Sequence, residues 1–283
     1  MAANAVTYYL TEHPTIVNFR WSPTQSYAST WSFLFAAVAF YIAAAVTLHL
    51  LLRLIFILIR RRDGHGIPLG PIPAVHSLIT AVISAVIFLG ILLSAAAEIR
   101  DTRWLWRRRT RTTAIEWFLC FPVGTRPSGR VFFWSYVFYL SRFLHLFRTF
   151  FSVIRRRRLS LFQLLNQSFL LCMSFLWLEF SQSIQVVAIL LMTMSNSVVY
   201  GYRFWTGIGL QGACFPFVVY NKAMLLLCLT ACHIAVPCIH LAKRGGCNGI
   251  GAWLFNSVLN AAISLLYLKF FVKTRSSRVH KAS

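Results

Sequence analysis

Long apolar stretches separated by short basic connections form the dominant pattern of the sequence. Seven of these stretches approach or exceed the roughly 20 residues that an α-helix needs to cross the hydrocarbon core of a bilayer. They lie at about residues 31–52, 74–97, 131–154, 161–178, 183–205, 215–241 and 252–272. Because lipid offers no water to an open strand edge, only helices can satisfy their own backbone there. The pattern therefore predicts an all-α integral membrane protein with seven transmembrane helices.

The composition supports this class. Of 283 residues, 58% are apolar and only 12% are charged, against about 25% charged in a typical soluble domain. Lys and Arg number 28 against 6 Asp and Glu, a formal net charge of +22. In a soluble protein this excess would indicate nucleic acid, but here the basic runs lie between apolar stretches, where they meet anionic lipid head groups. We therefore expect membrane lipids and no nucleic acid as partners. Binding of anionic substrates such as CoA phosphates is the alternative.

Short connections and the lack of a recognisable repeat in the sequence predict a single membrane domain over residues 1–283. Seven crossings place the two termini on opposite faces of the membrane. Basic runs at 60–62 and 155–158 and the basic C-terminal tail can share one face, which the positive-inside rule makes cytosolic. The basic cluster between residues 100 and 130 falls on the other face, so the rule barely decides the orientation. An uncleaved first helix, with no basic segment before it, is expected to direct the chain to the endoplasmic reticulum.

Acidic residues and cysteines exclude several kinds of chemistry. Only one of the six carboxylates, Glu179, lies in an apolar stretch, so neither paired-carboxylate catalysis nor a hard-metal cluster is expected. We expect no metal site. The seven cysteines are an odd number, and most lie in apolar stretches, where cysteine packs as a small hydrophobe. Cys120 and Cys247 lie in connections and form the one candidate disulfide pair.

Polar side chains recur at helical spacing on the third, fourth and fifth predicted helices. They are Arg142, His145 and Arg148 on the third, Gln163, Asn166 and Gln167 on the fourth, and Asn196 with Tyr200 on the fifth. Each set lies along one side of its helix. Such groups are costly in lipid and are by default hypotheses of function, here a polar pocket. The alternative is a set of interhelical hydrogen bonds that hold the bundle together.

At these residues the sequence resembles the ELO family of fatty acid elongases, over about residues 21–272. It is most similar to a plant branch of elongation-of-fatty-acids-protein-3-like members. The segments that carry the resemblance are YVFYLSR at 136–142, TFFSVIR at 149–155, LSLFQLLNQ at 159–167, FLWLEFSQS at 175–183, VYGY at 199–202 and CNG at 247–249. Family members condense malonyl-CoA with a long-chain acyl-CoA to give 3-oxoacyl-CoA, in very-long-chain fatty acid and sphingolipid biosynthesis.

The resemblance implies a helical barrel that encloses an acyl tunnel open to the cytosol. It implies the endoplasmic reticulum membrane, with a lumenal N-terminus and a cytosolic C-terminus. The substrates would be acyl-CoA and malonyl-CoA with no further cofactor. The other enzymes of the elongation cycle would be partners, and a homodimer is left open. Cys120 and Cys247 match the family's lumenal cysteines, and Arg142, Arg148, Tyr200 and Tyr202 are expected to contact substrate.

The histidine box of the family, HxxHH, is degenerate in this chain. Its three histidines align with Gln163, Asn166 and Gln167, and a further family histidine aligns with Asn196. In the family an imidazole of the box takes the acyl group from CoA, because imidazole has a pKa near neutrality and is nucleophilic. A carboxamide retains only hydrogen bonding. The family's reaction therefore cannot run unchanged at these positions.

The KxxExxDT pattern of the family also departs on the third helix, where it aligns with Arg142, His145, Arg148 and Thr149. His145 is the one histidine near this polar layer, and it is a candidate for a relocated nucleophile. Two hypotheses follow: an elongase condensing enzyme, or a catalytically silent family member that binds acyl-CoA and modulates the elongase complex. A transporter is disfavoured, because the spans show no inverted repeat.

Overall fold

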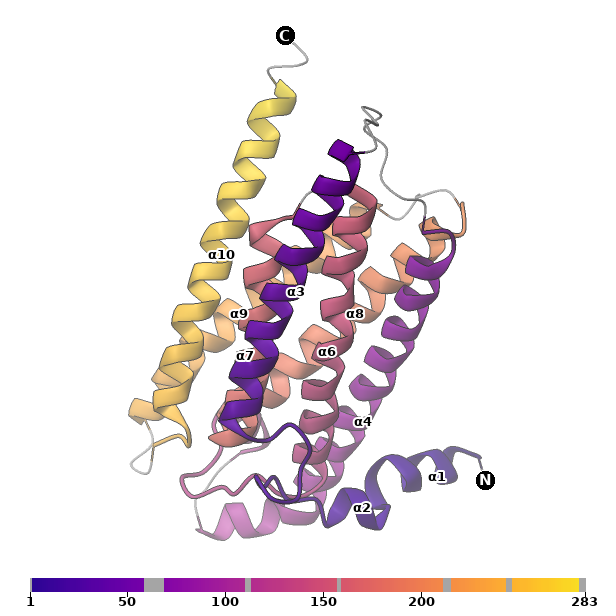
Figure 1. Cartoon of the computed structure of the whole chain (residues 1–283). Coiled ribbons are helices and arrows are strands. Elements are labelled where there is room, and N and C mark those ends of the chain that lie inside the picture. Colours follow the sequence, from indigo (N-terminus) through magenta and orange to yellow (C-terminus); the bar gives the residue numbers. More distant parts are fainter. Residues whose placement is uncertain are drawn as a thin grey trace.

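The computed structural model describes residues 2–58, 69–109, 113–156, 159–210, 215–242 and 246–279. These parts of the chain are almost entirely helical (Figure 1). The long helices are α3 (Trp31–Leu58), α4 (Ile72–Arg109), α6 (Arg130–Arg156), α7 (Leu161–Glu179), α8 (Gln185–Gly207), α9 (Phe215–Ala242) and α10 (Ile250–Val279). The short helices are α1 (Ala2–Thr7), η1 (Tyr8–Glu12), α2 (Pro14–Val17) and α5 (Ala114–Leu119).

The predicted fold class is confirmed. Within the described residues, six helices are long and apolar enough to cross a membrane: α3, α4, α6, α7, α8 and α9. Helix α10 covers the seventh predicted span, and its apolar part at Ile250–Leu265 is shorter. The chain is thus a multi-pass integral membrane protein.

Three helices extend well beyond the predicted apolar spans. Helix α3 continues from residue 52 to Leu58, α4 continues from residue 97 through a basic stretch to Arg109, and α10 continues from residue 272 to Val279. Arginine and leucine are good helix formers, so a helix that is already nucleated propagates through them. The apolar residues of a helix therefore show which part of it lies in lipid. They do not show where the helix ends.

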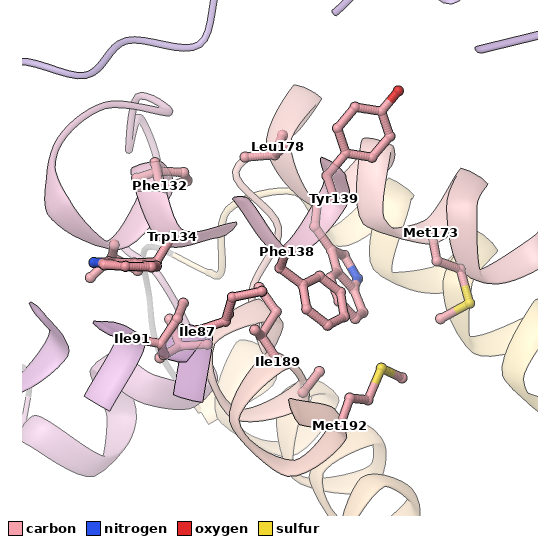
Figure 2. Packing of buried hydrophobic residues seen from close by; sticks show 14 of the residues in the cluster. Ile87, Ile91, Phe132, Trp134, Phe138, Tyr139, Met173, Leu178, Ile189 and Met192 are labelled. Carbon is pink, nitrogen blue, oxygen red and sulfur yellow. The ribbon is translucent and has the colours of Figure 1, made fainter. Parts of the chain in front are cut away.

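Helix α6 lies at the centre of the bundle and contacts α3, α4, α7 and α8. Helix α4 packs along α8 over most of its length, α9 packs on α8, and α10 packs on α7. The core between them is aromatic and aliphatic (Figure 2). Phe138 and Tyr139 of α6, Phe175 of α7, and Ile87 and Ile91 of α4 are each at most 1% exposed.

The outer faces of the bundle are apolar as well. Phe40 of α3, Val82 of α4, Leu227 of α9 and Val258 of α10 are each more than half exposed. Apolar surface this extensive is unusual in a soluble monomer. It fits helices whose outer faces contact lipid, and it explains why the hydrophobic pattern of α3, α4 and α9 runs all around the helix.

The two ends of the bundle differ. Helices α1, η1 and α2 lie across one end, and the last turns of α10 lie at the other (Figure 1). At the first end Trp134 Nε1 donates to the Leu10 carbonyl over 2.9 Å, which fixes η1 to α6. The opposite placement agrees with an odd number of crossings. The basic run at 60–62, residues 157–158 of the second run, and residues 280–283 of the tail lie outside the described residues.

Cross-links between distant connections hold the end of the bundle that carries α1. A disulfide joins Cys120, which follows α5, to Cys247, which precedes α10, with the Cα atoms 5.1 Å apart. Next to it, Asn248 Nδ2 donates to the carbonyls of Thr125, Phe180 and Ser181, and its Oδ1 accepts from Gly124 N. These contacts join three separate segments at one end of the bundle.

Candidate functional site

A buried polar network lies between α6 and α8. Arg142 Nη2 lies 3.1 Å from His145 Nε2, one turn along α6. His145 Nδ1 lies 2.8 Å from the hydroxyl of Tyr200 on α8. All three side chains are at most 3% exposed. His145 and Tyr200, two sequence-predicted groups on different helices, are thereby brought together by a hydrogen bond between the helices.

Aromatic contacts fix the orientation of this network. The guanidinium of Arg142 lies 4.2 Å from the ring centre of Phe138, and that of Arg203 lies 5.4 Å from the ring centre of Tyr200. The rings of His145 and Tyr200 meet edge to face, with their centres 5.0 Å apart. Cations favour the electron-rich face of a ring, and this attraction strengthens where water is excluded. Arg142 and Tyr200 are therefore each held on two sides.

The direction of the hydrogen bonds follows from their donors. A guanidinium can only donate, so His145 Nε2 accepts from Arg142 and carries no proton. The neutral imidazole then carries its proton on Nδ1 and donates it to the Tyr200 oxygen. The lone pair with which His145 could attack a thioester is occupied. The geometry favours a hydrogen-bonding role for His145 over that of a relocated nucleophile.

A second polar link joins α3, α6 and α7. The hydroxyls of Tyr41 and Thr149 are 2.6 Å apart and both are buried, and Gln163 Nε2 donates to Thr149 Oγ1 over 3.4 Å. Sequence reasoning missed Tyr41. Its only signal is a hydroxyl-bearing ring in the middle of an apolar stretch, which is also compatible with plain core packing.

The amides at the predicted histidine-box positions differ in burial and in hydrogen-bond partners. Gln163 joins the Thr149 link, and Gln167 is buried at 6% exposure, while Asn166 is half-buried. On α8, Asn196 Nδ2 is buried and has no hydrogen-bond partner among the described residues. Arg148 and Tyr202 are both half-buried.

Further buried amides, which the sequence analysis did not single out, lie at the end of the bundle with the disulfide. Asn256 Nδ2 of α10 donates to Gln182 Oε1, and Gln185 Nε2 of α8 donates to the Ser135 hydroxyl over 3.5 Å. All four are at most 1% exposed. These contacts are hydrogen bonds between separate segments of the bundle, of the kind that hold membrane helices together.

Metal binding has no geometric support in the described parts of the chain, where no three His, Cys, Asp or Glu side chains gather closely enough to hold an ion. The hollows on the surface are apolar. One of about 400 Å³ lies between η1 and α4, beside Tyr9 and Leu89, and another of about 360 Å³ lies between α4 and α6, beside Val82 and Leu140.

The fold and the network define a polytopic membrane protein with a buried polar site. Comparison with known proteins shows its family: the sequence model of the ELO (GNS1/SUR4) family matches residues 26–283. The chain belongs to this family. An Arabidopsis thaliana protein named "Fatty acid elongase 3-like" is 60% identical over 274 residues, which are 96% of this chain and 93% of that protein.

A more distant relative comes from Dictyostelium discoideum. A protein there named "Putative fatty acid elongase" is 22% identical over 166 residues, which are 58% of this chain and 56% of that protein. No solved structure matches the chain significantly. The family resemblance that the sequence segments indicated is thereby confirmed, and with it the expectation of a fatty acid elongase-like protein.

Proposed function

We propose that this protein accepts long-chain acyl-CoA and malonyl-CoA and forms 3-oxoacyl-CoA, in very-long-chain fatty acid and sphingolipid biosynthesis at the endoplasmic reticulum. The observation that carries the proposal is the Arg142–His145–Tyr200 network, which is buried inside the bundle and includes two of the residues expected to align with the family's KxxExxDT pattern. The name of the 60% identical relative supports the same activity.

The condensation has a route that needs no histidine nucleophile. Malonyl-CoA loses CO2, and the carbanion that remains beside its thioester attacks the carbonyl carbon of the acyl-CoA. A carbon–carbon bond forms, the bond between the acyl carbon and the CoA sulfur breaks, and the CoA thiolate takes up a proton from solvent. The products are 3-oxoacyl-CoA, free CoA and CO2. The protein needs to position the two thioesters and to stabilise the negative charge that the oxygen of the acyl carbonyl acquires when its carbon is attacked. Hydrogen-bond donors in a site without water stabilise this charge well.

The acyl chain would lie among apolar helices, in the tunnel that the family implies, and its CoA phosphates would meet the basic residues at the α6–α7 end of the bundle. Arg155 is exposed there at the end of α6, and arginine matches phosphate geometry. Arg142, Arg148, Tyr200 and Tyr202 would contact the substrates. Reductases and a dehydratase of the elongation cycle would take up the product. No cofactor beyond the substrates would be required. A homodimer is compatible with this scheme.

A second candidate is a catalytically silent member that binds acyl-CoA and modulates the elongase complex. The specific observation in its favour is the chemistry of Gln163, Asn166 and Gln167 together with the occupied lone pair of His145. Amides and a neutral, hydrogen-bonded imidazole can hold a thioester without taking its acyl group.

Expression in a yeast strain that lacks its own elongases separates the two candidates. We expect new acyl chains of C20 to C26 in total lipid, measured by gas chromatography. We also expect the purified protein to release CoA from acyl-CoA only when malonyl-CoA is present, because no acyl-enzyme forms. Well-expressed protein that extends no chain but binds acyl-CoA supports the silent member. Release of CoA without malonyl-CoA contradicts the direct route.

A further inference from the structure

The proton of the Tyr200 hydroxyl has no acceptor in the described structure. Its oxygen accepts from His145 Nδ1, so its own proton points elsewhere. The side chain is 3% exposed, and water therefore does not reach it freely. Leaving a buried donor unsatisfied destabilises the folded protein. A hydroxyl that is held by two ring contacts and keeps an unused proton is arranged to donate to something that is not part of the protein.

A second unused donor lies one turn away on the same side of α8. Asn196 and Tyr200 are four residues apart, so their side chains are neighbours on the helix surface. Asn196 Nδ2 is buried and lacks a partner in this part of the chain. Ser197, which lies between them, faces another helix, because its hydroxyl donates to the Ala81 carbonyl of α4. The side of α8 that carries Tyr200 thus presents two donors, an O–H and an N–H, one helical turn apart.

Two adjacent donors without an acceptor match one chemical group, a single oxygen with two lone pairs. Resting on the proposed function, we infer that Tyr200 Oη and Asn196 Nδ2 donate to the carbonyl oxygen of the bound acyl thioester. The same pair stabilises the negative charge that this oxygen acquires when the acyl carbon is attacked. Tyr200 is then a catalytic residue, because it touches the reacting group.

His145 is a positioning residue in this arrangement. Hydrogen bonds run in one direction from Arg142 through His145 to Tyr200, and donors aligned in this way polarise one another. The imidazole accepts at one edge and donates at the other. A glutamine side chain can do the same, with its carbonyl toward Arg142 and its NH2 toward Tyr200, but a glutamine is not a nucleophile.

The test compares two ligands of the purified, full-length protein in lipid nanodiscs. Palmitoyl-CoA carries the thioester carbonyl, and hexadecyl-CoA is the thioether with a CH2 in its place. We expect the wild type to bind the thioester about five- to tenfold more tightly, as for one or two hydrogen bonds in a site without water. Tyr200→Phe and Asn196→Leu should lower this preference while the affinity for hexadecyl-CoA stays unchanged, which also shows that the variants are folded.

Matched variants separate positioning from other roles. His145→Gln should keep the preference for the thioester, and His145→Leu should lose it. Tyr220→Phe is the control, because this hydroxyl is on a side chain of α9 that is 70% exposed. It should behave as the wild type does.

The outcomes distinguish the inference from the proposed function. If both ligands bind the wild type equally, or if Tyr200→Phe retains the preference, the donor pair is wrong while acyl-CoA binding stands. If neither ligand binds saturably, acyl-CoA is not the ligand and both fail. Loss of the preference in His145→Gln contradicts the positioning role alone.

Discussion

At the scale of single residues, carboxamides take over two different tasks in this chain. Those of Gln163, Asn166 and Gln167, which are expected to align with the family's histidine box, offer hydrogen bonding alone. Asn248 instead joins three segments, because its Oδ1 accepts from one of them and its Nδ2 donates to carbonyls of two. The same functional group thus serves the site at one end of the bundle and the architecture at the other.

Asn248→Asp tests the architectural role. The substitution keeps the shape of the side chain and its acceptor toward Gly124, but it places a carboxylate oxygen against the carbonyls of Thr125, Phe180 and Ser181. Losing these hydrogen bonds and facing acceptor with acceptor should cost about 1–3 kcal/mol of stability. A lower melting temperature of the detergent-solubilised protein is the expected result. Asn18→Asp, at an exposed position, adds the same charge and should leave the melting temperature unchanged.

At the scale of helices, the contact between α4 and α6 depends on one small residue. Gly90 of α4 faces the ring of Trp134 so closely that an added Cβ would overlap it. Figure 2 shows this ring beside Ile87 and Ile91 of α4. Its Nε1 donates to Leu10, and the side chain is buried, so the ring has no room to withdraw. Small residues commonly allow such close helix approach in membranes.

Gly90→Ala should therefore separate α4 from α6 and destabilise the protein by about 1–3 kcal/mol, as overpacking does in other cores. The expected readout is a lower midpoint of thermal unfolding. Gly201→Ala on α8 is the matched control, because an added Cβ there meets nothing within 4 Å. That control should be neutral or slightly stabilising, since alanine favours a helix more than glycine does. Equal midpoints for the two variants would contradict the role of Gly90.

At the scale of the whole molecule, the two ends of the bundle have different chemistry. One end carries the Cys120–Cys247 disulfide, and the other carries the end of α6 with the exposed Arg155. Disulfides persist in oxidising compartments, and basic connections favour the cytosol. We expect the disulfide end to face the lumen, an orientation that the count of basic residues alone barely favours. Both features are satisfied at once if the disulfide end is lumenal.

We accordingly expect the C-terminus on the cytosolic side. In sealed microsomes, a tag at the C-terminus should be removed by added protease, and a tag at the N-terminus should be protected until detergent is added. Mass spectrometry without reduction should find the peptides of Cys120 and Cys247 linked. A protected C-terminal tag, or free thiols at both cysteines, would contradict this orientation.

The sequence by itself determined the class of this protein, its helices and its family. Apolar stretches near the thickness of a bilayer leave helix as the only backbone solution, so the local pattern alone located seven long helices, six of which are long and apolar enough to cross a membrane within the described residues. The sequence also identified the buried polar positions, because a polar residue is easily recognised within an apolar stretch. Helix ends were less readable, since α3 and α4 continue beyond their apolar parts.

Tertiary structure alone decided which polar groups meet and in which direction they donate. His145 and Tyr200 are 55 residues apart, and Tyr41 and Thr149 are 108 apart. Periodicity places each on a side of its own helix, but the rotation and depth of one helix against another depend on packing across the whole core. For that reason the sequence left His145 open as a nucleophile, while its contact with Arg142 shows that its lone pair is already engaged.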